Sequence, residues 1–142
     1  MKRGVIDASV ILKWYLPDEE LGSVALRVLD RFLSNELEIL APSLLEYELL
    51  NGLVIAQRRG RIREETTLSA VDGFRNLEMK LSGLSALYPK VLHYCTRYGC
   101  TAYDAAYLAV ADDEGVPLVT ADQRLHRAVS KDLKWVRWLG EI

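Results

Sequence analysis

The sequence contains few of the residues that define several common classes of protein: among 142 residues there are only 2 Cys, 2 His and 4 Pro. Cys95 and Cys100 are too few for a disulfide framework and lack the His or Cys companions of a zinc site. We expect free, mostly buried thiols instead of a bridge or a ligand pair. Neither histidine lies near a serine or cysteine motif, which disfavours a nucleophilic hydrolase.

Long apolar runs and glycine-rich loops are also absent. Charged residues interrupt every apolar segment well before the ~18 residues that a membrane span requires. Asp7 lies where a signal peptide would need its apolar stretch, so we expect a soluble cytoplasmic protein with no membrane association. Neither GxGxxG nor GxxxxGK[ST] occurs, which excludes the usual dinucleotide-binding and nucleotide-triphosphate-binding classes.

Positive charge does not dominate, because the formal net charge is −2. This argues against a protein that coats nucleic acid but permits an enzyme that contacts a few phosphates. Local basicity occurs at residues 57–63, where four arginines flank a glycine: Arg58, Arg59, Arg61 and Arg63. We favour surface cations at a helix C-terminus, with contacts to RNA as the alternative.

The chain has the length and composition of one compact globular domain, residues 1–142, with 50% hydrophobic and 27% charged residues. Apolar runs predict buried strands at residues 4–6, 37–41 and 118–120, a half-exposed strand at 77–81 and a final strand at 133–139. Helices are predicted from Ser9 up to Pro17 and at 21–32, 43–59, 64–76, 85–98, 101–114 and 122–130. This alternation predicts a three-layer α/β/α sandwich with a mainly parallel sheet, in which sites form at the carboxyl ends of strands.

Asp7 follows the first predicted strand directly. Ser9 can cap the next helix without help from Asp7. Asp7 is thus left without a necessary structural role, and we favour a functional one.

The helix predicted from Ser43 holds two glutamates with different surroundings. Ser43-Leu-Leu-Glu46 matches a capping box, which gives Glu46 a structural role. Glu48 lies ~200° around the helix from Glu46, whereas Asn51 lies only ~60° from Glu48. The rest of this helix is apolar nearly all round, so a carboxylate there must be neutralised, paired or bound to metal. We favour function for Glu48, with a solvent-facing gap or an arginine salt bridge as the alternative.

Asp104 and Asp122 can each be explained locally. Thr101-Ala-Tyr-Asp104 is a good capping box, and Asp122 can cap the helix that follows it. Residues 105–111 form a solidly apolar helix whose N-terminus would point inward beside the sheet, and Thr120 supplies a second oxygen at the strand end before Asp122. These two observations favour function.

As a set, Asp7, Glu48, Asp104 and Asp122 lie where apolar runs meet the first turns of helices, settings in which an isolated carboxylate is poorly solvated. A hard divalent cation would gather them, because Mg²⁺ and Mn²⁺ prefer carboxylate oxygens and water. A metal held in this way can hydrolyse phosphodiester bonds.

Four stretches resemble the PIN-domain ribonucleases, in particular the VapC-type toxins of toxin–antitoxin pairs. They are Val-Ile-Asp7-Ala-Ser9, Ala-Pro-Ser-Leu-Leu-Glu-Tyr-Glu48-Leu-Leu-Asn51, Thr101-Ala-Tyr-Asp104-Ala-Ala-Tyr-Leu-Ala and Leu-Val-Thr120-Ala-Asp122. The resemblance implies an α/β/α fold in which the four acids surround Mg²⁺ or Mn²⁺, supported by Ser9, Asn51 and Thr120. It also implies a homodimer and an antitoxin partner that blocks the site.

We therefore expect a Mg²⁺-dependent endoribonuclease in which Asp7 and Asp104 are direct metal ligands. Glu48 and Asp122 complete the shell, directly or through water, or orient the nucleophile. Two alternatives stay open: a PIN nuclease for RNA processing or decay, and a catalytically silent module that only binds partners.

Overall fold

The structure, a computed structural model, describes residues 1–142 and is built on one five-stranded sheet with strand order β3-β2-β1-β4-β5. The strands are β1 (Arg3–Ile6), β2 (Glu38–Pro42), β3 (Lys80–Ser82), β4 (Leu118–Thr120) and β5 (Val136–Trp138). Every neighbouring pair is parallel. The predicted α/β class with a parallel sheet is confirmed.

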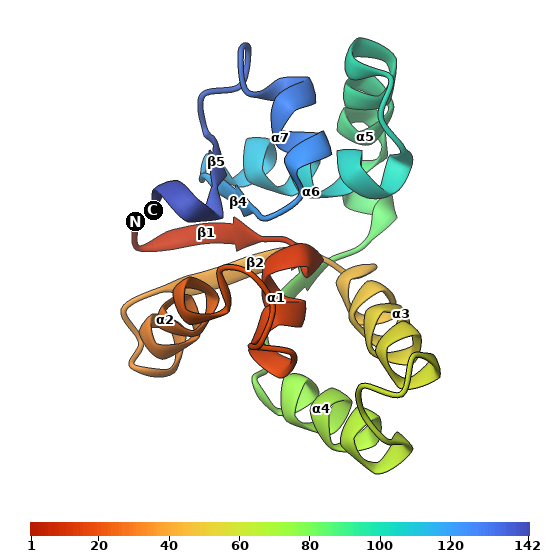
Figure 1. The fold of residues 1–142 in the computed structure, drawn as a ribbon. Helices are drawn as coiled ribbons and strands as arrows, with labels where there is room; N and C mark the ends of the chain where they lie inside the picture. Colours follow the sequence, from red (N-terminus) through yellow and green to blue (C-terminus); the bar gives the residue numbers. More distant parts are fainter.

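Seven α-helices lie on the two sides of this sheet (Figure 1). One side carries α1 (Ala8–Tyr15), α2 (Gly22–Leu33), α3 (Leu45–Arg58) and α4 (Glu64–Asn76). The other carries α5 (Leu84–Tyr98), α6 (Ala102–Glu114) and α7 (Gln123–Val129). A 3-10 helix, η1 (Leu139–Glu141), follows β5. None of the helices is both long and apolar enough to cross a membrane.

The core lies between the sheet and its two helical layers. In β1 and β4 the strand residues Val5, Ile6, Leu118 and Val119 are fully buried, as expected for parallel strands covered on both faces. Helix α6 is buried along its whole middle, from Ala105 to Ala111, because it packs against β1, β2 and β4 on one side and α5 on the other. The prediction of an apolar helix lying beside the sheet is confirmed.

The chain reverses its direction of winding between the two central strands. From β1 it crosses α1 and α2 to β2, and from β4 it crosses α7, on the opposite side of the sheet, to β5. In open parallel sheets, ligands bind outside the carboxyl ends of strands at such a point of reversal. The ends of β1 and β4, which carry Asp7 and Thr120, are therefore the first place to look for a site.

The two least regular strands differ from their predicted bounds. The strand predicted at 77–81 begins at Lys80, because Leu77 ends α4 and Glu78 has a left-handed φ of 53°, which an extended strand cannot accommodate. The strand predicted at 133–139 is confined to Val136–Trp138, because Leu133 and Val136 form a tight turn in which Val136 N–H donates to the Leu133 carbonyl at 3.0 Å.

The capping box predicted at Ser43 is wrong. Helix α3 begins at Leu45, its cap residue Leu44 makes no side-chain hydrogen bond, and the Ser43 contact to Glu46 runs through the backbone carbonyl at 3.4 Å. Ser43 is engaged differently: its N–H donates at 2.8 Å to the carbonyl of Ser82, the last residue of β3. Glu46 is exposed and has no capping role.

Candidate active site

Asp7 is held at the end of β1 by the start of α1. Its side chain is only 5% exposed, and its Oδ1 accepts hydrogen bonds from the backbone N–H of Ser9 at 3.1 Å and from the Ser9 hydroxyl. Asp7 is thus the N-cap of α1. The expectation that Ser9 alone caps this helix is wrong, and Asp7 has a structural role in addition to any chemical one.

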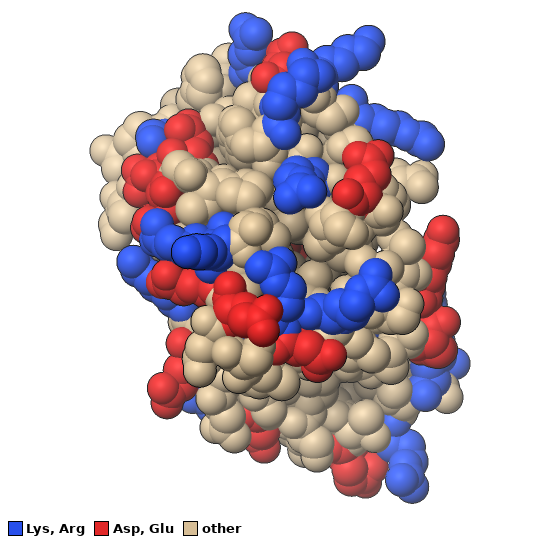
Figure 2. Space-filling model, turned by 90° about the vertical axis from the view of Figure 1, so that its left-hand side faces the viewer, with Lys and Arg blue, Asp and Glu red and all other residues tan.

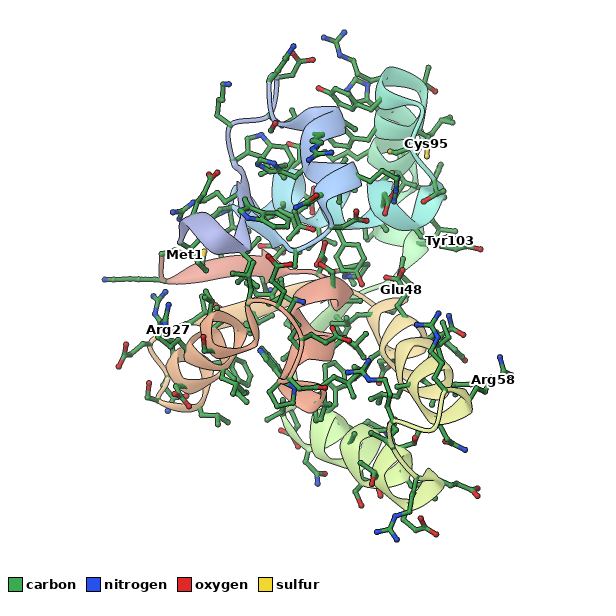
Figure 3. The ribbon with its side chains drawn as sticks, viewed as in Figure 1. Met1, Arg27, Glu48, Arg58, Cys95 and Tyr103 are labelled. Atoms are coloured by element: carbon green, nitrogen blue, oxygen red, sulfur yellow. The ribbon has the colours of Figure 1, made fainter.

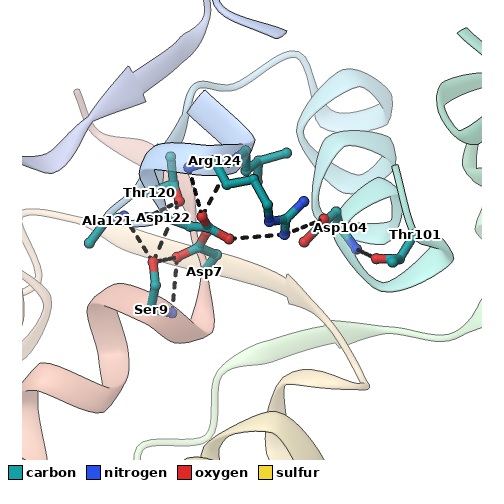
Figure 4. Close-up of polar contacts among 9 residues, drawn as sticks. Asp7, Ser9, Thr101, Asp104, Thr120, Ala121, Asp122 and Arg124 are labelled. Atoms are coloured by element: carbon teal, nitrogen blue, oxygen red, sulfur yellow. Dashed lines mark hydrogen bonds and ion pairs between the residues drawn. The ribbon is translucent and has the colours of Figure 1, made fainter. Parts of the chain in front are cut away.

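Ser9 joins the two central strand ends. Its Oγ accepts a hydrogen bond from the backbone N–H of Ala121 at 2.8 Å and lies 3.5 Å from Oγ1 of Thr120. Thr120, which is fully buried at the end of β4, in turn accepts the N–H of Asp122 at 3.0 Å. Ser9 and Thr120 therefore fix the position of Asp7 relative to Asp122 (Figure 4).

Burial raises the pKa of Asp7 from its ordinary 3.8 to about 6, even though the hydrogen bonds from Ser9 favour the charged form. The negative charge of Asp122 contributes to the rise. The two carboxylates are thus close enough to repel each other, and a positive charge between them would restore the ionised form of Asp7.

Glu48 lies on α3 and meets α6 through Tyr107. The Tyr107 hydroxyl donates to Oε1 of Glu48 at 2.6 Å. Burial raises the pKa of Glu48; the tyrosine hydrogen bond opposes this rise and the charge of Asp104 adds to it. The structure therefore brings Glu48 within the electrostatic range of Asp104, although 56 residues separate them in the chain.

Asp104 and Asp122 meet at one arginine. Nη2 of Arg124 lies 2.9 Å from Oδ2 of Asp104 and 3.2 Å from Oδ2 of Asp122. The Oδ1 atom of Asp122 caps α7 by accepting the N–H groups of Arg124 and Leu125 at 3.0 and 3.3 Å. Thr101 caps α6 by accepting the N–H of Asp104 at 3.1 Å, which confirms one half of the predicted capping box; the Asp104 side chain pairs with Arg124 instead of the Thr101 N–H.

The donor atoms fit a hard divalent cation. Neutral donors engage only one oxygen in each of three carboxylates: Oδ1 of Asp7, Oε1 of Glu48 and Oδ1 of Asp122. The second oxygen of each, and both side-chain oxygens of Asp104, are not bound by a neutral group. Carboxylates with a free oxygen are the ligands that Mg²⁺ and Mn²⁺ prefer. No three acidic side chains lie close enough together in this structure to hold a metal ion, and Arg124 occupies the space between Asp104 and Asp122.

The remaining predicted residues lie farther from this cluster. Asn51 is exposed on α3, makes no side-chain hydrogen bond and does not join Glu48. Arg58 lies at the opposite end of α3 from Glu48 (Figure 3), about 15 Å away at the helical rise per residue. Arg61 is bound in ion pairs to Asp18 and Glu19 at 3.1 and 2.9 Å. The exposed Arg58, Arg59 and Arg63 remain candidate RNA contacts.

The end of the molecule that holds the chain termini offers no continuous basic surface. Lys and Arg side chains are interspersed there with Asp and Glu side chains (Figure 2). Arg3, for example, is paired with Glu38 and Glu114 at 3.1 and 3.0 Å. This side of the molecule gives no preference for a polyanion.

Two residues of the cluster were missed in the sequence. Tyr107 lies within the apolar run 105–111, where it is indistinguishable from a core residue. Its spacing of three from Asp104 places both on neighbouring positions of one helix face, which is the signal that could have identified it. Arg124, two residues after Asp122, gave no signal beyond its charge.

Comparisons with known proteins identify the family of this chain and several relatives. Residues 4–131, which include the four acids, match the PIN domain family. Ribonuclease VapC1 of Mycobacterium tuberculosis is 32% identical over 130 residues, covering 90% of this chain and 92% of that protein. Ribonuclease VapC3 of Pyrobaculum aerophilum is 29% identical over 123 residues, covering 85% of this chain and 90% of that protein.

Among solved structures, the crystal structure of PAE2754 from Pyrobaculum aerophilum superposes with a TM-score of 0.68. The alignment covers 99% of this chain and 85% of that chain at 24% sequence identity, so the likeness concerns the fold. The family match over residues 4–131 and the similarity to VapC ribonucleases along most of the sequence establish that the chain belongs to the PIN-domain family.

Proposed function

We propose that this protein is a divalent-metal-dependent endoribonuclease and that residues 1–142 act as one PIN-like nuclease domain. The observation that carries the proposal is that the four acids approach one another in pairs near the point where the sheet reverses its winding. Asp7 interacts with Asp122, Glu48 interacts with Asp104, and Asp104 and Asp122 share Arg124. The naming of two relatives as ribonucleases supports RNA as the substrate.

Each residue of the cluster has a proposed role. Asp7 and Asp104 would hold Mg²⁺ or Mn²⁺ directly, and Asp122 and Glu48 would complete the shell or orient the attacking water. The chemistry supplied by the bound cation is polarisation of the scissile phosphate and activation of water for in-line attack. Ser9 and Thr120 keep Asp7 and Asp122 in place, and Tyr107 holds Glu48 by its 2.6 Å hydrogen bond.

The test is cleavage of labelled RNA by purified protein in Mg²⁺ or Mn²⁺ and in EDTA. We expect cleavage that requires the metal and is lost in Asp7→Asn and in Asp104→Asn, while circular dichroism shows that both variants fold. Asp113→Asn is the matched control on α6, because Asp113 is exposed and contacts only Lys90 at 3.3 Å. Unchanged cleavage by both site variants in Mg²⁺ would overturn the proposal.

We further propose that the protein is the toxin of a toxin–antitoxin pair, acting on cytoplasmic RNA, since its relatives carry the VapC name. A surface that an antitoxin helix could cover lies between α3 and α4. Tyr47 and Leu50 on α3, with Val71 and Phe74 on α4, line a cavity of about 190 Å³. Induced expression should arrest growth and generate new RNA ends. RNA processing without growth arrest would instead indicate a maturation or decay enzyme.

A homodimer is the final part of the proposal. Leu84, Tyr88 and Leu92 form a row along α5, each four residues from the next and each more than 60% exposed. An exposed apolar row of this kind is typical of a protein interface. Light scattering should show a dimer that Leu92→Glu converts to a monomer; a wild-type monomer would contradict this assignment.

A further inference from the structure

Arg124 is the one cation in direct contact with the acidic cluster. A single nitrogen of its guanidinium, Nη2, lies between Oδ2 of Asp104 and Oδ2 of Asp122, at 2.9 and 3.2 Å. These carboxylates come from different helices, α6 and the cap of α7, and they converge on one positive atom (Figure 4). The point on which they converge is therefore a position for a positive charge.

A divalent cation at that position would exclude the guanidinium. Mg²⁺ binds carboxylate oxygens at about 2.0–2.1 Å, so the two Oδ2 atoms must break their contacts with the arginine in order to bind the cation. The exchange leaves the local fold intact, because Oδ1 of Asp122 keeps the α7 cap and Thr101 keeps the α6 cap. The Arg124 side chain is 65% exposed, so it can leave without crossing packed side chains.

RNA requires a positive group near the acids. The four carboxylates repel a phosphate, and Arg58 lies about 15 Å from Glu48 along α3. A displaced Arg124 guanidinium stays tethered two residues from Asp122, at the edge of the cluster. Its planar array of donors suits a phosphate group well.

We propose that Arg124 is a substrate-positioning residue that exchanges anionic partners. Without metal it is the counter-ion of Asp104 and Asp122, and when a divalent cation binds, it moves to a phosphate of the RNA. This inference rests on the proposed nuclease function, and it predicts opposite effects of one substitution on metal binding and on RNA binding.

The first measurement is Mn²⁺ affinity without RNA, followed by the loss of the free Mn²⁺ resonance signal. Arg124→Gln removes the internal competitor and should bind Mn²⁺ about two- to five-fold more tightly, the range of an exposed ion pair. Arg127→Gln is the matched control, because Arg127 lies one turn along α7, bears the same charge and contacts only Gln123. Equal or weaker Mn²⁺ binding by Arg124→Gln than by Arg127→Gln would overturn the inference.

The second measurement is steady-state cleavage of a fluorescein-labelled single-stranded RNA at saturating Mn²⁺. Loss of the phosphate contact in Arg124→Gln should raise KM about ten-fold, with a smaller effect on kcat, and Arg124→Lys should recover part of the loss. An unchanged KM would contradict the phosphate contact. If the wild-type protein neither binds Mn²⁺ nor cleaves RNA, the nuclease proposal fails and this inference fails with it. If the wild-type protein is active and Arg124→Gln has the same Mn²⁺ affinity and the same KM, only the proposed exchange of partners is refuted.

Discussion

The Tyr107 hydroxyl donates a 2.6 Å hydrogen bond to Oε1 of Glu48, joining α6 to α3 across 59 residues of sequence. Tyr107 is 3% exposed, and burial together with the nearby carboxylates raises its pKa, so it stays a neutral donor at any physiological pH. Glu48 is therefore fixed in direction by a group that cannot lose its proton, with Oε2 left for another partner.

The two glutamates of α3 provide a matched pair for testing this role. Glu48→Gln keeps the size of the side chain but removes the charge, and we expect RNA cleavage to fall by about two orders of magnitude or more, the usual effect of removing an acid–base or water-orienting group. Glu46→Gln, two residues away and exposed, should cleave at the wild-type rate. Equal rates for both variants would show that Glu48 has no part in catalysis.

Substituting Tyr107, the hydrogen-bond donor, tests whether this hydrogen bond positions Glu48. Tyr107→Phe leaves Oε1 of Glu48 half-buried without its partner, which should lower the free energy of unfolding by about 1–3 kcal/mol. Because Glu48 also loses its orientation, we expect kcat to fall while KM changes little. Urea denaturation measures the stability and steady-state kinetics measure kcat and KM, and Tyr103→Phe is the control, since Tyr103 is exposed on the same helix.

The elements could be predicted because each depends on local periodicity or on a local breaker. Helix α6 was recognisable from its unbroken apolar run, and β1 and β4 from short apolar runs that acids follow within two residues. The Glu78 turn could not be foreseen, because its positive φ occurs at a residue with no glycine-like signal. The prediction of a Ser43 cap was wrong because the backbone N–H of Ser43 donates to Ser82 on β3 instead, and this tertiary contact has no local signal.

The residues of the candidate site also fall into two groups, those that local sequence identifies and those that depend on distant contacts. Asp7, Asp104 and Asp122 lie at strand ends or helix starts, positions that the chain marks locally, and the structure places all three there. Tyr107 and Arg124 owe their importance to partners far along the chain or on another helix, Glu48 and Asp104 respectively. Residue type and spacing carry little information about such contacts.

Stability without metal should depend on the ionisation of Asp7. Its pKa is about 6 in the folded protein against an ordinary 3.8, so the folded state holds the proton more strongly than the unfolded chain. This contribution to stability is fully present below about pH 4 and is lost as the pH rises through 6. Asp7→Asn lacks the ionisation, and in EDTA it should gain stability relative to wild type by on the order of 3 kcal/mol between pH 4 and pH 7.

Thermal denaturation of both proteins at several pH values in EDTA measures this difference. Groups remote from Asp7 titrate equally in the two proteins, so the difference between them reports the ionisation of Asp7 together with its coupling to Asp122. A wild-type protein that becomes more stable relative to Asp7→Asn as the pH rises would contradict the buried, proton-binding state of this carboxyl group.

Bound metal should reverse the dependence of stability on pH. A cation that binds only the folded protein stabilises it by about 2.7 kcal/mol at one hundred times its dissociation constant, and it relieves the repulsion between Asp7 and Asp122. We expect millimolar Mg²⁺ or Mn²⁺ to raise the melting temperature of the wild-type protein at pH 7 by several degrees, and to raise that of Asp7→Asn much less. At pH 5 the rise should shrink, because protons compete for Asp7. No shift at any pH would count strongly against a metal site at these acids.

Ser9→Ala tests whether the link between the strand ends matters in its own right. The substitution leaves the partly buried N–H of Ala121 without its 2.8 Å acceptor and removes the hydroxyl donor to Asp7. We expect a loss of about 1–3 kcal/mol in the free energy of unfolding and weaker Mn²⁺ binding, since Asp7 and Asp122 are no longer held in register. Ser9→Thr, which keeps the hydroxyl, should recover both properties, whereas Ser23→Ala on the exposed start of α2 should affect neither. If the Ser9→Ala protein is destabilised but binds Mn²⁺ with wild-type affinity, Ser9 has a structural role only.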